Sequence, residues 1–122
     1  MIAIVDDDAS VRVAISSLVR SYGFATEAFC SAEDFLKIVD LGRLYCVVTD
    51  IQMPGMNGLE LHKQMIDCRL KIPFVFMTAF HSNSIRDKAF ANGSVGFLLK
   101  PFSGAELVTQ IELAVAAVTP PP

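Results

Sequence analysis

The chain has 122 residues, of which 52% are hydrophobic, and a formal net charge of -3 at pH 7. This length suits one domain, and the apolar content is sufficient for one hydrophobic core. Because the pI is near 5.2 and the Lys and Arg residues are scattered, we expect no direct contact with nucleic acid. No apolar stretch approaches the roughly 18 residues of a membrane span, and residues 1–5 are too short for a signal peptide. We therefore expect a cytoplasmic protein without a membrane contact.

The three cysteines, Cys30, Cys46 and Cys68, are odd in number, widely spaced and without a CxxC pattern. This arrangement argues against a disulfide framework and against a zinc site. We expect free thiols that behave as small hydrophobic side chains.

Short apolar runs alternate with helical patterns along the whole chain. The predicted strands cover residues 2–5, 24–29, 45–49, 74–77 and 95–99. The predicted helices cover residues 9–22, a short segment between a Ser31 cap and Gly42, residues 58–66, residues 82–92 and a closing helix whose apolar positions run from 107 to 118. The helix over residues 82–92 has the fewest apolar residues for a core, so we expect it to be the least firmly packed. Five strands that alternate with five helices predict a doubly wound α/β fold with a parallel sheet.

Polar residues follow four of the predicted strands: Asp6, Asp7 and Asp8, then Asp50, then Thr78, and finally Lys100. The carboxyl ends of parallel strands share one edge of the sheet, so these side chains are expected to converge. Carboxylates brought together repel one another and need a cation, and oxygen ligands suit Mg²⁺. Beside such a metal, Asp50 is a nucleophile for a phosphoryl group whose oxygens Thr78 and Lys100 would neutralise. The pattern predicts a phosphoryl-accepting switch.

Four motifs in order resemble the response-regulator receiver domains of bacterial two-component signalling. They are Ile4-Val5-Asp6-Asp7, the stretch Val48-Thr49-Asp50-Ile51-Gln52-Met53-Pro54-Gly55-Met56-Asn57-Gly58, Met77-Thr78-Ala79, and Gly96-Phe97-Leu98-Leu99-Lys100-Pro101-Phe102. Each motif alone is weak, but the four together, at domain-scale spacing, are highly specific. The resemblance covers residues 2–118, and its details are most similar to the FixJ-like receivers, which usually precede a DNA-binding output domain.

This resemblance implies a flavodoxin-like sheet of order 2-1-3-4-5. It implies that Asp50 is the phosphoacceptor for a sensor histidine kinase, so the domain is regulatory and catalyses only its own phosphoryl transfer and dephosphorylation. Asp7 and Asp50 would bind Mg²⁺ directly, with Mn²⁺ as a possible substitute. Asp6 would reach the metal through water, and the backbone carbonyl of Gln52 would complete the protein ligands.

Further roles implied by the resemblance concern the switch. Thr78 would move to bond the phosphoryl group, Phe97 would turn inward with it, and Lys100 would supply a positive charge. The Lys100-Pro101 peptide bond is expected to be cis. Phosphorylation would change the face formed by residues 82–118, and so control homodimerisation or a transcriptional output domain.

The lifetime of the phosphoryl group depends on the residues beside the path of an attacking water, here Gln52 and Phe80. Phe80 can exclude water without orienting it, and Gln52 can donate to the phosphoryl group without acting as a base. We therefore expect slow self-dephosphorylation.

The domain is expected to cover residues 1–118. The Pro-rich tail over residues 119–122 is expected to begin a linker to an output domain.

Several alternatives compete with this interpretation. Asp6-x-Asp8 also resembles the opening motif of haloacid-dehalogenase-type phosphatases, although no acidic pair outside the last helix follows Lys100. A receiver fold that signals without phosphorylation would typically lack an acid or the lysine, and a flavin-binding relative would need a phosphate loop after the first strand. Taken alone, Asp8 is better explained as an acid at a helix start than as a third metal ligand. Phe97 taken alone is a core aromatic residue and not a switch. The histidines, His62 and His81, have no assigned role.

Overall fold

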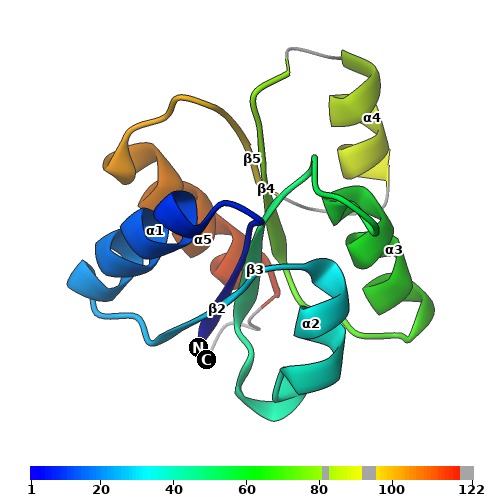
Figure 1. The fold of residues 1–122 in the computed structure, drawn as a ribbon, viewed down its shortest axis with the longest axis horizontal. Coiled ribbons are helices and arrows are strands. Elements are labelled where there is room, and N and C mark those ends of the chain that lie inside the picture. The colour runs from blue at the N-terminus through cyan, green and yellow to red at the C-terminus, as the bar shows by residue number, and fades with distance from the viewer. Residues whose placement is uncertain (81–82, 92–95, 119–122) are drawn as a thin grey trace.

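Five parallel strands form the central sheet of the computed structural model, which describes residues 1–80, 83–91 and 96–118 (Figure 1). The strands are β1 (Ile2–Val5), β2 (Thr26–Phe29), β3 (Cys46–Asp50), β4 (Phe74–Thr78) and β5 (Gly96–Leu99). Their order across the sheet is β2-β1-β3-β4-β5. This confirms the predicted doubly wound fold and the sheet order that the family resemblance implied.

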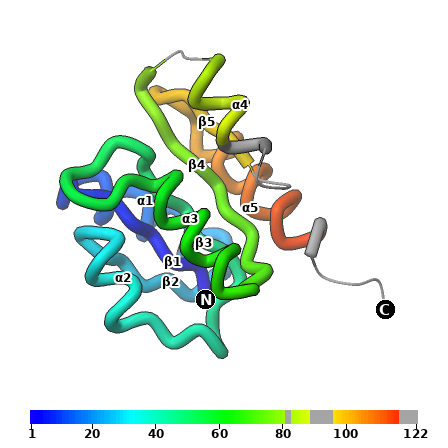
Figure 2. The backbone as a smooth tube through the Cα atoms, turned by 90° about the vertical axis from the view of Figure 1, so that its right-hand side faces the viewer, coloured from blue at the N-terminus to red at the C-terminus, as the bar shows by residue number. Residues whose placement is uncertain are grey.

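Helices cover both faces of the sheet, with α1 and α5 on one side and α2, α3 and α4 on the other (Figure 1). The helices are α1 (Ala9–Ser21), α2 (Ala32–Ile38), α3 (Gly58–Asp67), α4 (Asn83–Ala91) and α5 (Gly104–Val118), and a short 3₁₀ helix covers Leu41–Arg43. In the view of Figure 2, α4, β5 and α5 lie together at the side of the molecule opposite β2 and α2. No helix within the described ranges is long and apolar enough to cross a membrane.

Alternating side chains of each inner strand pack into two separate cores. On β1, Ile2 and Ile4 belong to the core beneath α1 and α5, whereas Ala3 and Val5 belong to the core beneath α2 and α3. All four are 0% exposed. Burial of a large aliphatic side chain contributes roughly 1.5–3 kcal/mol to folding, so the strands are firmly fixed. Their carboxyl ends consequently form a rigid edge for polar side chains.

The strand and helix ends differ from the prediction by a residue or two. The first helix ends at Ser21, because Tyr22 is its C-cap and Gly23 follows with a φ of +95°. The third and fourth strands each continue one residue further, to Asp50 and Thr78, because Asp50 pairs with Met77 and Thr78 pairs with Leu99. The predicted end points 82, 92 and 95 and the predicted tail lie outside the described residues.

Helix α4 is weakly packed where its side chains are described. Over residues 83–88 only Ile85 is partly buried, and the other five side chains are exposed. This supports the expectation that α4 is held less firmly than its neighbours.

The unassigned histidine on α3 is a core residue. His62 is buried, and its ring centroid lies 4.6 Å from that of Phe74 and 5.4 Å from that of Phe76. Burial lowers the pKa of His62, so the ring packs as a neutral aromatic group. All three cysteines are free, as predicted, but only Cys46 is buried as a small hydrophobic side chain, whereas Cys30 and Cys68 are exposed.

Candidate functional site

The register of the sheet brings the polar residues of four strand ends to one edge. Val5 pairs with Thr49, so the next residues, Asp6 and Asp50, follow at the same level. Strands β1 and β3 are neighbours although β2 lies between them in sequence. Their carboxyl ends therefore flank the switch point of the sheet, where open α/β folds bind ligands.

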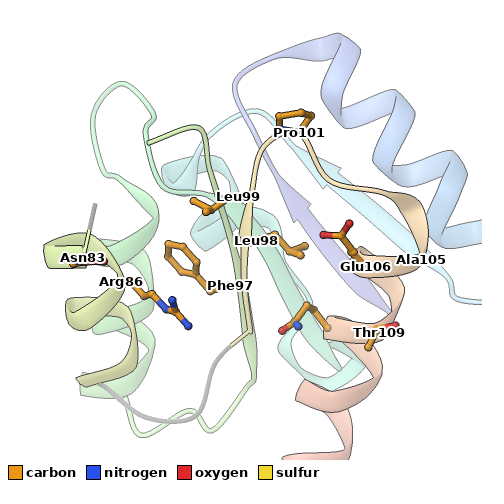
Figure 3. Close-up of a pocket in the computed structure, with 10 residues that line it drawn as sticks. Asn83, Arg86, Phe97, Leu98, Leu99, Pro101, Ala105, Glu106 and Thr109 are labelled. Carbon is orange, nitrogen blue, oxygen red and sulfur yellow. The ribbon is translucent and has the colours of Figure 1, made fainter. Parts of the chain in front are cut away.

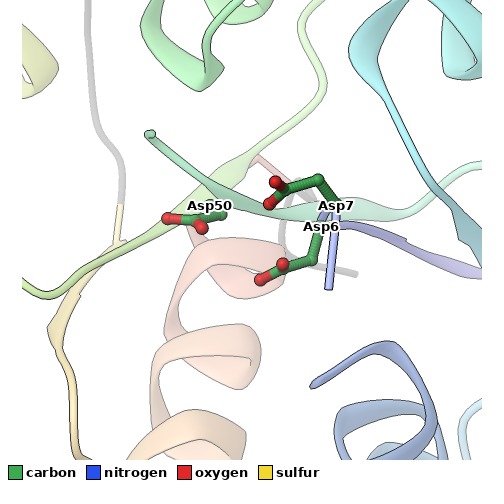
Figure 4. Close-up of side chains that lie close together, drawn as sticks. All are labelled: Asp6, Asp7 and Asp50. Atoms are coloured by element: carbon green, nitrogen blue, oxygen red, sulfur yellow. The ribbon is translucent and has the colours of Figure 1, made fainter. Parts of the chain in front are cut away.

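Three carboxylates meet at this switch point. One carboxylate oxygen from each of Asp6, Asp7 and Asp50 lies within 4.8 Å of the others (Figure 4). Asp6 is 1% exposed and Asp50 is 8% exposed, whereas Asp7 is open to solvent. A set of hard oxygen donors with an open side fits a hard divalent cation, so this cluster could hold a metal ion.

Lys100 is the cation that the structure places between the two buried acids. Its Nζ lies 3.4 Å from Oδ2 of Asp6 and 3.5 Å from Oδ2 of Asp50. The backbone N–H of Lys100 also donates to the carbonyl of Thr78 over 2.8 Å. Its peptide bond to Pro101 is cis, the form that the family resemblance implied.

Opposing effects act on the pKa of the Asp50 carboxyl. Burial raises the pKa of the Asp50 carboxyl above its ordinary value, and repulsion by Asp6 acts in the same direction. Attraction to Lys100 opposes both effects. A further cation beside the open face of Asp7 would favour the charged, nucleophilic form of Asp50.

The turn between β1 and α1 is fixed by hydrogen bonds around Asp6. Oδ1 of Asp6 accepts from the backbone N–H of Asp8 over 2.9 Å, and Asp8 itself caps α1 by accepting from Ser10 N over 2.8 Å. Asp8 is therefore a helix cap, as expected, and lies outside the three-carboxylate cluster. The guanidinium of Arg12 donates from Nη1 to the backbone carbonyl of Asp6 over 2.7 Å. The sequence pattern does not indicate this role for Arg12, because nothing in the spacing links it to a carbonyl six residues earlier.

The loop between β3 and α3 is held close to the site. A Cβ at Gly58 would collide with the backbone carbonyl oxygen of Asp50, so only glycine permits this approach. Asn57 caps α3 through a capping box with Glu60, with hydrogen bonds of 2.8 and 2.9 Å. From the other side, the carboxylate of Glu33 accepts from Met56 N over 3.4 Å. Glu33 is a second contributor that the sequence pattern did not reveal.

The hydroxyl of Thr78 is fully engaged in this structure. Oγ1 donates to the side-chain Oε1 of Gln52 over 2.8 Å and accepts from the backbone N–H of Phe80 over 3.1 Å. Thr78 is 0% exposed, whereas the side chain of Phe80 is largely exposed. Gln52 was predicted to contribute its backbone carbonyl and to face a phosphoryl group, but its bond to Thr78 was not foreseen.

Phe97 lies away from the acidic cluster, on the part of β5 that faces α4. It is partly buried against the core beneath α2 and α3, and Figure 3 shows its ring directed toward α4. It borders a cavity of about 860 Å³ over β5, between α4 and α5. The other residues around this cavity are Asn83, Arg86, Leu98, Leu99, Pro101, Ala105, Glu106, Thr109 and Gln110.

Comparison with known proteins gives the family of this fold and its acidic switch point. The family model for the response regulator receiver domain matches residues 2–112. The chain is 39% identical over 114 residues to the response regulator protein TodT of Pseudomonas putida, covering 93% of this chain and 50% of TodT. It is 35% identical over 119 residues to the transcriptional regulatory protein FixJ of Bradyrhizobium diazoefficiens, covering 98% and 58%. The chain thus belongs to the response regulator receiver domain family.

Solved structures agree with this assignment. The structure titled FixJ-N has a TM-score of 0.86 and 31% identity, and the match covers 98% of this chain and 96% of that one. The response regulator StyR has a TM-score of 0.87 and 38% identity, with coverage of 95% and 59%. The chain is a FixJ-like receiver domain, a regulatory module of two-component systems and not a conventional enzyme. It spans about half the length of the curated relatives it matches.

The acidic cluster predicts a specific response to divalent cations. Mutual repulsion of three carboxylates opposes folding, so a cation that binds there should stabilise the protein by mass action. We predict that Mg²⁺ raises the melting temperature and that Asp7→Ala abolishes this shift without lowering the stability of the metal-free protein. At a hundredfold excess over Kd the stabilisation should be about 2.7 kcal/mol. Thermal unfolding with and without Mg²⁺ measures the shift in melting temperature and the stability of the metal-free variant.

The control is Asp67→Ala, which removes an equal charge from the exposed end of α3. This variant should keep the full Mg²⁺ response. An Asp7→Ala protein that is clearly less stable without metal would assign Asp7 a structural role instead.

Proposed function

We propose that Asp50 accepts a phosphoryl group from the phosphohistidine of a sensor histidine kinase, in a Mg²⁺-dependent reaction in the cytoplasm. The observation that carries this proposal is the convergence of Asp6, Asp7 and Asp50, with the ammonium of Lys100 paired to Asp6 and Asp50. A purely structural ion pair does not need three acids, one of them exposed. An acceptor for a highly charged group needs a nucleophile, a metal position and a cation together.

In the proposed reaction an oxygen of Asp50 attacks phosphorus in line with the phosphorus–nitrogen bond of the phosphohistidine. The oxygen–phosphorus bond forms as the phosphorus–nitrogen bond breaks, and the imidazole nitrogen keeps the electron pair and takes a proton from solvent. The product is an acyl phosphate on Asp50. Lys100 neutralises the transferred group, and the hydroxyl of Thr78 donates a hydrogen bond to it.

The proposed metal ligands are the carboxylates of Asp7 and Asp50 and the backbone carbonyl of Gln52, with Asp6 acting through a water molecule. Bound Mg²⁺, or Mn²⁺ in its place, would offset the negative charge shared by the carboxylates and the incoming phosphoryl group. Asp6 keeps its hydrogen bond to Asp8 N while it serves this role.

The proposed output is a change at the face formed by α4, β5 and α5. The hydrogen bond from Lys100 N to the Thr78 carbonyl joins the ends of β4 and β5, so a shift of Thr78 acts directly on β5. Phe97 lies on β5 and borders the cavity between α4 and α5 (Figure 3), which would offer space for its ring to change position. The weak packing of α4 makes this face the easiest part of the fold to rearrange.

The proposals about domain organisation and output are based on the relatives. TodT and FixJ extend well beyond the matched region, and FixJ is described as a transcriptional regulator. We propose that residues 1–118 form the receiver and that residues 119–122, outside the described part, begin a linker to a transcriptional output domain. Phosphorylation would promote homodimerisation through the α4, β5 and α5 face, and the receiver itself would not touch DNA.

The acceptor assignment is tested with acetyl phosphate and Mg²⁺. We predict that the protein gains the mass of one phosphoryl group, because Asp50 is the acid with Lys100 and two further carboxylates beside it. Asp50→Asn should gain none. Asp8→Asn is the matched control, since Asn also caps a helix, and it should gain the group normally. Intact-mass spectrometry measures all three, and equal uptake by Asp50→Asn would refute the assignment and favour a receiver that signals without phosphorylation.

The output face is tested by NMR with beryllofluoride, a phosphoryl mimic. We predict that the largest shift changes fall in residues 83–91 and 96–118, and that self-association increases, because the moving hydroxyl acts on β5. Changes confined to α2 and the 3₁₀ helix at Leu41–Arg43, on the opposite side of the molecule, would contradict the proposed output.

Phosphate lifetime is tested at Phe80, whose N–H is tied to Thr78 and whose ring is exposed beside the site. We predict that Phe80→Glu loses labelled phosphate severalfold faster in excess Mg²⁺, because a carboxylate can orient an attacking water. Phe80→Leu, which stays apolar, should remain slow. Equal decay in Phe80→Glu and the native protein would mean that Phe80 does not border the path of water.

A further inference from the structure

The hydroxyl of Thr78 is held by the side chain of Gln52, which lies on the loop between β3 and α3. Its oxygen already accepts a hydrogen bond from Phe80 N over 3.1 Å, so its proton points to the remaining partner, Oε1 of Gln52, over 2.8 Å. Thr78 is 0% exposed, which means that water does not compete for this proton. The bond joins residues 26 positions apart, one on the loop after β3 and one at the end of β4.

A hydroxyl has only one proton to donate. A phosphoryl oxygen on Asp50 is an acceptor only, so Thr78 can bond it only by withdrawing its proton from Gln52. The two hydrogen bonds are mutually exclusive. The Gln52 bond therefore stabilises the arrangement without a phosphoryl group and opposes the one with it.

We propose that Gln52 is a positioning residue whose side chain holds the Thr78 hydroxyl in the unphosphorylated state. This hydrogen bond, here called the latch, lowers the affinity of the site for a phosphoryl group and so sets how readily the domain switches. The proposal rests on the proposed function of Asp50 as phosphoacceptor and adds a regulatory role for an amide that does not itself react. It assigns two separate tasks to one residue, since the backbone carbonyl of Gln52 serves the metal and its side chain serves Thr78.

The surroundings of Gln52 allow the latch to open. Its side chain is half-buried and borders a groove of about 570 Å³ between the β3–α3 loop and α4. Across this groove lie Ile85 and Lys88 of α4. This groove is the space into which the amide would move when it leaves Thr78. Opening the latch then also changes the contact between this loop and the weakly packed helix α4.

The test is the affinity for beryllofluoride in the presence of saturating Mg²⁺, measured by NMR titration. Gln52→Met keeps the length of the side chain and the backbone carbonyl but removes the acceptor. We expect this variant to bind beryllofluoride about two- to tenfold more tightly than the native chain, the factor that one net hydrogen bond supplies. Gln64→Met, the same change at an exposed position of α3, is the matched control and should leave the affinity unchanged.

A second variant shows whether the effect of Gln52→Met passes through the Thr78 hydroxyl or is a general effect of the substitution. Thr78→Val removes the hydroxyl, so Gln52→Met should have no additional effect on beryllofluoride affinity in that background. The same gain in both backgrounds would overturn the proposal, because the effect would not pass through Thr78. Weaker binding by Gln52→Met in the native background would also overturn it, and would show that the amide donates to the phosphoryl group.

Failure of this inference is distinct from failure of the proposed function. A native chain that binds no beryllofluoride and takes up no phosphoryl group would overturn the proposed function and the latch with it. A native chain that does both, with an unchanged affinity in Gln52→Met, would overturn the latch alone. If Gln52→Met does not fold, Gln52→Ala carries the same expectation, because it also lacks the acceptor.

Discussion

The repulsion among three carboxylates held at one edge of a rigid sheet is the constraint on which the rest of the site depends. Two of these acids, Asp6 and Asp50, are buried, and the protein balances them with the single ammonium of Lys100. These ion pairs do not fully offset burial and the repulsion by Asp6, so the pKa of Asp50 stays raised. This excess of negative charge would favour a bound cation, and such a cation would in turn favour the charged form of Asp50.

The surrounding structure tolerates this imbalance because the acids cannot move apart. The two apolar cores fix the strands, and the hydrogen bonds of Arg12 and Asp8 fix the turn that carries Asp6. Behind Asp50, the absence of a side chain at Gly58 lets the start of α3 approach the strand end. The charged groups are therefore held by the well-packed part of the sheet, whereas the described side chains of α4 are mostly exposed.

The sequence predicted the sheet well because its inner strands are buried on both faces. A parallel strand covered on both sides reads as a short continuous apolar run, and residues 2–5 and 74–77 are such runs. Prediction was less accurate at the ends, as at Thr78, because the pairing with β5 and not the local sequence decides where β4 stops. The short second helix was also found, since its Ser31 cap accepts from Asp34 N over 3.0 Å as the pattern indicates.

What the sequence by itself determined is the fold, the family and the residues that meet at the sheet edge, because each acid, hydroxyl and ammonium directly follows its own apolar run. Only the tertiary structure decided how these groups pair. The bridge of Lys100 between Asp6 and Asp50, the bond of Arg12 to the Asp6 carbonyl and the bond of Thr78 to Gln52 each depend on side-chain direction. Such contacts join residues that have no shared period or spacing, and their geometry is set by packing across the sheet, which no local pattern encodes.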